Sequence, residues 1–350
     1  DHWKKTLVTR DGANGFRRVV RPDTPDGIAN STVSEGIAYG MILSVYFDDQ
    51  ALFDDLFQYS QHWADSTGLM AWYVDPTGTE ACMGADDWSA ASDSDEDIAF
   101  ALIMADTKWG GGGSLDESYR DHALRQIALV KEHEVHESGV FKPGNRWGGP
   151  ELLNISYFAP AFYEIFGRYT GDVEFWDRVI DVNYEALFNC LNEANGNQDN
   201  GLVPAWSNYD GEPVVAFDGA PTHFQTDSIR TPFRIAQHYY WTGDPRAKAY
   251  LDKVNSFFGP LGASNLTDEY ELDGTPKPMA APLASSQSAV VVGCTAVAAM
   301  SDPQYDAYVS ESYDLLCTLE LTARSTYYQL SWTALALAFM TGEYVDLTTQ

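Results

Sequence analysis

A helix ending of one form recurs three times along this chain and constrains its fold more than any other feature. The segments Tyr169-Thr170-Gly171-Asp172, Trp241-Thr242-Gly243-Asp244 and Met340-Thr341-Gly342-Glu343 each close an aromatic-rich helical pattern with a glycine suited to cap a helix C-terminus. A new helical pattern follows the first two endings almost at once. Helical hairpins repeated at long intervals are typical of a ring or stack of such units.

Apolar residues recur at helical spacing through most of the chain, whereas strand patterns are limited to short pieces such as 214–217. The 350 residues are enough for about six hairpins. We therefore expect an all-α toroid of inner and outer helices, with a groove at one end. Because no linker divides the chain, residues 1–350 are expected to form a single domain. The expected helices cover 37–47, 51–64, 97–108, 118–132, 155–169, 173–191, 228–241, 245–258, 288–300, 306–318 and 326–340.

Composition excludes several classes of partner. The net charge is −30, with 51 acidic against 21 basic residues. This argues against nucleic acid and anionic membranes, because phosphate binding needs clustered Lys and Arg. No apolar run could span a bilayer, and no signal peptide is present, so a processed N-terminus at Asp1 is expected. Histidines do not cluster and the four cysteines lack zinc spacing, with Cys294 and Cys317 expected to be buried. We expect no metal, no cofactor and a neutral polymer as partner.

Four acidic residues occupy five positions in Asp93-Ser94-Asp95-Glu96-Asp97, directly before an apolar helical pattern. One interpretation is a helix N-terminus, where Ser and Asp cap free N–H groups and acids favour the helix dipole. Carboxylates this close also repel one another, which favours a functional cluster.

A lone glutamate, Glu35, begins a slim helical pattern of small residues. Gly36 and Gly40 weaken the helix, so close packing is expected there. A carboxyl group in apolar surroundings has a raised pKa and can donate a proton near neutral pH. An isolated glutamate with a separate aspartate cluster is the minimal equipment for glycoside hydrolysis.

A third acid, Asp227, also precedes a helical pattern, where capping is again the alternative. Arg230 is expected to face the same side and to hold Asp227 ionised, as the base of an inverting mechanism requires. Tyr157 could present its hydroxyl to the attacking water, with core packing as the alternative. Loop tryptophans are candidates for stacking against sugar rings, although some are expected in the core: Trp72, Trp88, Trp147 and Trp206.

Four segments in matching order resemble glycoside hydrolase family 8, and the similarity runs from about residue 30 to 344. Residues 34–41 resemble that family's proton-donor motif, and residues 91–109 resemble its signature, with Ser94 where Ala or Gly is usual. Residues 154–160 resemble its Asn-Pro-Ser-Tyr-Phe-Ala-Pro segment, with Ile155 in place of proline. Residues 227–234 resemble the segment that carries the base, and the helix from Tyr327 resembles the closing helix.

The resemblance implies an (α/α)6 barrel that hydrolyses β-1,4-linked glycans with inversion. It makes Glu35 the general acid, Asp227 the general base and Asp93 the aspartate that grips the central sugar. Tyr157 would position the water and Arg230 would orient Asp227. The remaining substrate-binding residues are expected to be Trp88, Trp147, Trp206 and Tyr327.

The choice of glycan rests on finer features of the resemblance. Asp227 is retained, which argues against the chitosanase subgroup. The Leu-His-Pro obstruction of exo-acting xylo-oligosaccharide members is absent from 282–287, which favours an open groove and endo cleavage. The segment from Val290 is closer to the glucanase members. We expect a secreted bacterial, monomeric endo-β-1,4-glucanase; an endo-xylanase is the main alternative, followed by a chitosanase and a non-catalytic glycan-binding barrel.

Overall fold

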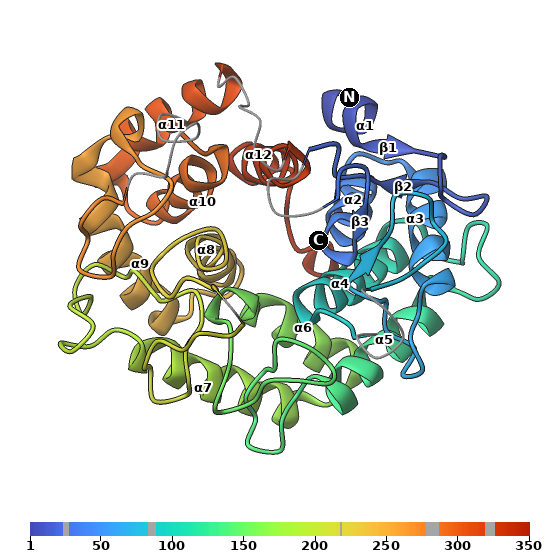
Figure 1. Ribbon diagram of the computed structural model, residues 1–350, viewed down its shortest axis with the longest axis horizontal. Coiled ribbons are helices and arrows are strands. Elements are labelled where there is room, and N and C mark those ends of the chain that lie inside the picture. Colours follow the sequence, from blue (N-terminus) through green and yellow to red (C-terminus); the bar gives the residue numbers. More distant parts are fainter. Residues whose placement is uncertain (24–27, 83–88, 218, 278–286, 319–325) are drawn as a thin grey trace.

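The computed structural model describes residues 1–23, 28–82, 89–217, 219–277, 287–318 and 326–350, and it shows a ring of helices (Figure 1). Inner and outer helices alternate along the chain, which confirms the predicted all-α toroid. The inner helices are α2 (Ser34–Tyr46), α4 (Ser92–Trp109), α6 (Pro160–Thr170), α8 (Thr231–Thr242), α10 (Ala289–Ala299) and α12 (Thr326–Met340). The outer helices are α1 (His2–Leu7), α3 (Gln50–His62), α5 (Tyr119–His133), α7 (Val173–Asn189), α9 (Pro245–Phe258) and α11 (Asp306–Thr318).

Amino-acid composition separates the two layers. Every residue of α10 is buried, and its sequence AVVVGCTAVAA carries no charge. The outer helix α9, PRAKAYLDKVNSFF, buries only one face. A helix that is apolar on all sides must be covered on all sides, whereas an amphipathic helix can stand between core and solvent. The inner layer therefore forms the core of the ring.

The ring is closed by the two ends of the chain. The last inner helix, α12, packs against both α10 and α2, and the short α1 packs against α12 as its outer partner. The indole N–H of Trp3 donates a hydrogen bond to the Ser331 hydroxyl at 2.9 Å. Thus the sixth helical pair is built from the first and the last helix.

The three glycine endings are confirmed. Gly171 and Gly243 are the C-caps of α6 and α8 in the left-handed conformation, and Gly342 after α12 has a φ of 79°. A side chain would strain the backbone at each of these positions.

Several local predictions were wrong. Residues 155–157 form a separate 3-10 turn, η2 (Ile155–Tyr157), because Pro160 starts α6. Residues 214–217 form no strand; the strands of the described chain are β1 (Val8–Thr9), β2 (Arg18–Val19), β3 (Thr32–Val33) and β4 (Tyr73–Val74), paired β1 with β2 and β3 with β4. Cys317 is exposed rather than buried, because it lies on the outward face of the outer helix α11.

Functional side chains gather where inner helices begin. Glu35 is the second residue of α2, Asp93 the second of α4 and Tyr327 the second of α12, while Arg230 immediately precedes α8. Contacts among these residues, described below, show that the four N-termini meet at one end of the ring. Among the described helices, none is both long enough and apolar enough to cross a membrane.

Candidate active site

Glu35 has a hydrogen-bond donor at each carboxylate oxygen. Its Oε2 accepts from Nη1 of Arg230, and its Oε1 accepts from the Tyr327 hydroxyl, both at 2.6 Å. The side chain is 18% exposed. Burial raises the pKa of Glu35 to about 7, although Arg230 opposes the shift; the nearby Asp93 raises this pKa further. Glu35 can therefore hold a proton near neutral pH, as a general acid must.

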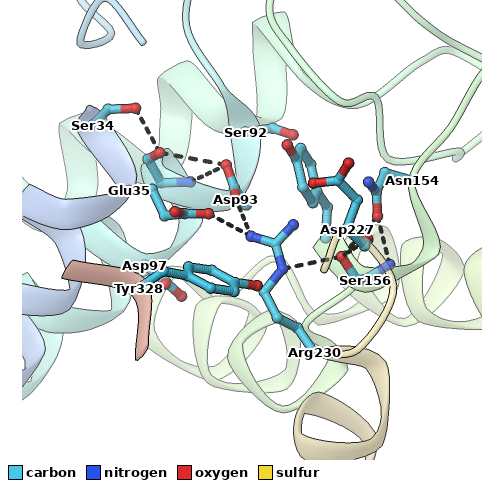
Figure 2. A network of polar contacts seen from close by, with 12 residues as sticks. Ser34, Glu35, Ser92, Asp93, Asp97, Asn154, Ser156, Asp227, Arg230 and Tyr328 are labelled. Atoms are coloured by element: carbon cyan, nitrogen blue, oxygen red, sulfur yellow. Dashed lines mark hydrogen bonds and ion pairs between the residues drawn. The ribbon is translucent and has the colours of Figure 1, made fainter. Parts of the chain in front are cut away.

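Arg230 lies between two acids. The same Nη1 that contacts Glu35 also contacts Oδ2 of Asp93 at 2.6 Å, and Nε donates to the Ser156 hydroxyl at 3.2 Å (Figure 2). The guanidinium lies 4.8 Å from the ring centre of Tyr157. One buried cation thus joins side chains from α2, α4 and η2.

The prediction that Arg230 faces the same side as the Asp227 carboxylate is wrong. Helix α8 begins at Thr231, so residues 227–230 are not on one helical face, and their three-residue spacing does not align the two side chains. Arg230 instead turns toward Glu35 and Asp93. Its link to Asp227 is indirect: Ser156, which accepts from Arg230, can donate to the main-chain carbonyl of Asp227 at 2.6 Å.

Asp227 lies in the turn before α8 and does not cap that helix, whose N-cap residue is Arg230. The amide of Gln225 donates to Oδ2 of Asp227 at 3.2 Å. Figure 2 shows the Asp227 carboxylate on the opposite side of Arg230 from Glu35. The two predicted catalytic acids therefore lie on opposite sides of one arginine.

The acids of α4 divide between the site and the core. The predicted helix begins five residues too late, so all of them lie in the first two turns, where consecutive side chains point in different directions. Asp93 reaches Arg230, whereas Asp97 pairs with Arg234 at 2.8 Å, Glu96 accepts from Tyr163 at 2.7 Å and Asp95 accepts from Gln126 at 3.1 Å. Burial raises the pKa values of Asp95, Glu96 and Asp97.

Beside Asp227 lies a cleft of about 700 Å³ with an aromatic lining. Trp147 and Trp206 are in it as predicted, together with Tyr157, and the rings of Trp147 and Trp206 lie 5.6 Å apart. Trp206 is only 3% exposed, so it supports the cleft wall and offers little ring surface to a substrate. The remaining predicted ring, Trp88, lies outside the described residues. The aromatic lining residues are Trp72, Trp147, Tyr157, Trp206 and Phe217.

Sequence reasoning missed Ser156, Gln225 and Phe217. Ser156 and Gln225 stand beside residues that were singled out, but nothing in their spacing indicates a contact with Arg230 or Asp227. Phe217 was assigned to a strand. In the described part of the chain, no group of three or more His, Cys, Asp or Glu side chains is arranged to hold a metal ion.

Comparison with known proteins identifies relatives over nearly the whole chain. The family model described as Glycosyl hydrolases family 8 matches residues 1–342. Endoglucanase A of Acetivibrio thermocellus is 37% identical over 347 residues, which is 98% of this chain and 68% of that protein. A reducing-end xylose-releasing exo-oligoxylanase of Paenibacillus barcinonensis is 28% identical over 69% of this chain and 65% of its own length.

The fold is shared with a solved glucanase. The apo structure of a β-1,3-1,4-glucanase from Paenibacillus sp. X4 superposes with a TM-score of 0.84 at 25% identity, covering 98% of this chain and 90% of that one. Ring architecture and sequence match therefore point to the same group of enzymes.

Proposed function

The chain belongs to glycosyl hydrolase family 8, and on that premise we propose that it is an endo-acting β-1,4-glucanase that inverts the anomeric carbon. One observation carries the proposal. Glu35, whose pKa is raised to about 7, lies on one side of Arg230, and Asp227, which lines the aromatic cleft, lies on the other. A proton donor and a separated carboxylate are what single-displacement hydrolysis requires.

In this mechanism each acid moves one proton. Glu35 gives its proton to the glycosidic oxygen as the bond to the anomeric carbon breaks. Asp227 takes a proton from a water whose oxygen forms the new bond at the opposite face of the sugar. Tyr157, beside Asp227 in the cleft lining, positions that water. Glu35 ends ionised and Asp227 protonated, so a proton exchange with solvent resets the site.

Asp93 suits a binding role better than that of the base. Its Oδ2 is engaged by Arg230 and its Oδ1 by the main-chain N–H of Ser94 at 2.9 Å, and the residue is 3% exposed. A carboxylate with both oxygens engaged has little capacity to accept a proton from water. Asp227, in contrast, lines the open cleft. We assign Asp93 and Arg230 to holding the sugar at the cleaved bond.

The choice of glucan rests on relatives. Endoglucanase A is similar over nearly all of this chain, and the superposed structure is a β-1,3-1,4-glucanase. Of the segment used to predict endo cleavage, residues 282–286 lie outside the described residues, so this part of the proposal depends on sequence alone. A single catalytic domain, a monomeric state and secretion belong to the same proposal.

The deciding test is reducing-sugar release from carboxymethyl-cellulose, mixed-linkage β-glucan, xylan and chitosan, measured side by side at neutral pH. We expect release from the two glucans. Release from xylan alone would support the second candidate, a xylan-cleaving enzyme, which the similarity to an exo-oligoxylanase favours. Proton NMR of fresh product should show the α-anomer first; β-anomer first would exclude inversion.

A further inference from the structure

Phe217 is an exposed aromatic side chain in an unusual place. Eight large hydrophobic side chains are exposed in the described part of the chain, and among these Phe217 alone lines the cleft beside Asp227. It is 57% exposed, and its neighbour Val215 is 62% exposed. Leaving an aromatic ring in water forfeits the free energy that burial would provide, and a ligand bound in the cleft would recover it.

The ring is held in place from behind. Trp206, almost fully buried, meets Phe217 edge to face, with ring centres 5.9 Å apart and an angle of 75° between the planes. The segment is tied back because the N–H of Val214 donates to the carbonyl of Trp206 at 2.9 Å. Phe217 therefore presents its free face to the cleft from a fixed support.

Trp206 also connects Phe217, through ring contacts, to the residues around Arg230. Trp206 contacts Tyr157, with ring centres 6.1 Å apart, and Tyr157 in turn contacts Arg230. A polymer chain that contacts both Asp227 and Phe217 would lie along this lining. Sugar rings have apolar faces that pack on aromatic rings, and a chain of linked sugars offers such a face at every unit.

We propose that Phe217 is a sugar-stacking residue of the cleft, binding a glucose ring other than the two that flank the cleaved bond. This inference rests on the proposed function. It makes Phe217 a determinant of preference for long glucan chains over short ones, because only a long chain reaches both the acids and this ring.

The test compares Phe217→Ala with Phe217→Tyr and with a matched control. Phe47 is a suitable control because it is 60% exposed and caps the C-terminal end of α2, roughly 20 Å along that helix from Glu35. With mixed-linkage β-glucan, Phe217→Ala should raise KM about tenfold and leave kcat nearly unchanged. Phe217→Tyr should restore the wild-type KM, and Phe47→Ala should match the wild type.

Substrate length provides the second readout. The KM effect of Phe217→Ala should shrink as cello-oligosaccharides are shortened, and calorimetric binding of β-glucan to a Glu35→Gln background should weaken by a similar factor. An equal effect at every length, a loss confined to kcat, or no effect on β-glucan would overturn the inference while leaving the proposed function intact. A wild-type enzyme that leaves β-glucan uncut would overturn both.

Discussion

Two arginines at the start of α8 form the same kind of ion pair in different surroundings. Arg230 and Arg234 lie four residues apart, and each pairs with an aspartate of α4, Asp93 and Asp97, which are also four residues apart. Arg234 pairs with one carboxylate inside the ring, where its guanidinium also lies 5.2 Å from the ring centre of Phe162. Arg230 pairs with two carboxylates beside the cleft.

The difference between the two ion pairs supports the role proposed for Glu35. One cation against one carboxylate is balanced, and its main effect is to join α8 to α4. One cation against two carboxylates leaves a negative charge in excess, which a proton on Glu35 can neutralise. In the proposed mechanism this proton goes to the glycosidic oxygen, and the Glu35 side chain that carries it is 18% exposed.

The largest expected effect on activity comes from removing the proton that Glu35 carries. Glu35→Gln should lower kcat on β-glucan by roughly 10²–10⁴-fold, because an amide cannot protonate the leaving oxygen. Initial-rate kinetics measure the loss, and circular dichroism should show an unchanged fold. Glu174→Gln is a matched control, since Glu174 is the second residue of α7 as Glu35 is of α2, but is exposed. A variant that kept near-native kcat would remove Glu35 from the mechanism.

The Arg234–Asp97 ion pair should contribute to the stability of the fold rather than to activity. Arg234→Met leaves Asp97 as a buried charge without its partner and should lower the free energy of unfolding by about 3–5 kcal/mol, measured by urea denaturation. Arg230→Met should cost less, because water in the cleft can reach Glu35. Adding Asp97→Asn to Arg234→Met should recover much of the loss. If Arg230→Met proved the more destabilising change, the contrast between the two arginines would be wrong.

The site in which Arg230 faces both Glu35 and Asp93 should affect how activity depends on pH. The Glu35 pKa of about 7 predicts that kcat/KM falls as pH rises above about 7, because the acid loses its proton. Arg230 favours the ionised form of Glu35, so Arg230→Gln should raise the pKa of Glu35. The fall of kcat/KM on the basic side of its pH profile, the basic limb, should then move to higher pH, and the maximum of kcat/KM should be lower. Arg246→Gln, at an exposed ion pair with Asp181, should leave the limb in place. A basic limb that moved to lower pH would contradict the assigned role of Arg230.

The smallest effect is expected behind the site, at Glu134, the fully buried residue that caps the end of α5 and lies near the Asp95 carboxylate. Burial, with the Asp95 charge, raises the pKa of Glu134 above its usual 4.5. The folded state therefore binds a proton that the unfolded state releases, so the stability this carboxyl contributes is complete below pH 4.5 and declines as pH rises.

The isosteric Glu134→Gln should change the free energy of unfolding at pH 7 by less than about 1 kcal/mol and should flatten its decline above pH 4.5. Unfolding curves at several pH values measure both. Glu132→Gln, on the exposed face of α5, should leave the wild-type pH dependence as it is. A strongly destabilised Glu134→Gln protein would show that Glu134 is ionised in the fold.

Sequence periodicity was a good guide to the ring and a poor guide to side-chain partners. The apolar patterns and glycine endings predicted every helix from α2 to α12, because these features depend on local structure. The short α1 was missed, since its helix depends on packing against α12. Glu35, Asp93 and Asp227 were found as acids at helix starts, but the partner of Arg230 was wrong because α8 begins only after it.

Exposure was the quantity least accessible from the sequence. Trp206 and Phe217 were both recognisable as aromatic residues outside the helices, yet which ring would be buried behind the other depends on how the chain crosses the end of the ring. Likewise, the acids of α4 look alike in sequence, and only the neighbouring helices decide that Asp93 meets Arg230 while Asp95 turns toward Gln126 of α5.

Closure of the ring by α12 also sets the order in which the site can be completed. Glu35 lies on the first inner helix, but the hydroxyl that holds its Oε1 belongs to Tyr327 on the last, 292 residues later. During synthesis, both proposed catalytic acids leave the ribosome long before Tyr327 does. A nascent chain that ends before α12 therefore contains the acids of a hydrolase without the contact that seats one of them, and competence arrives only with the final helix.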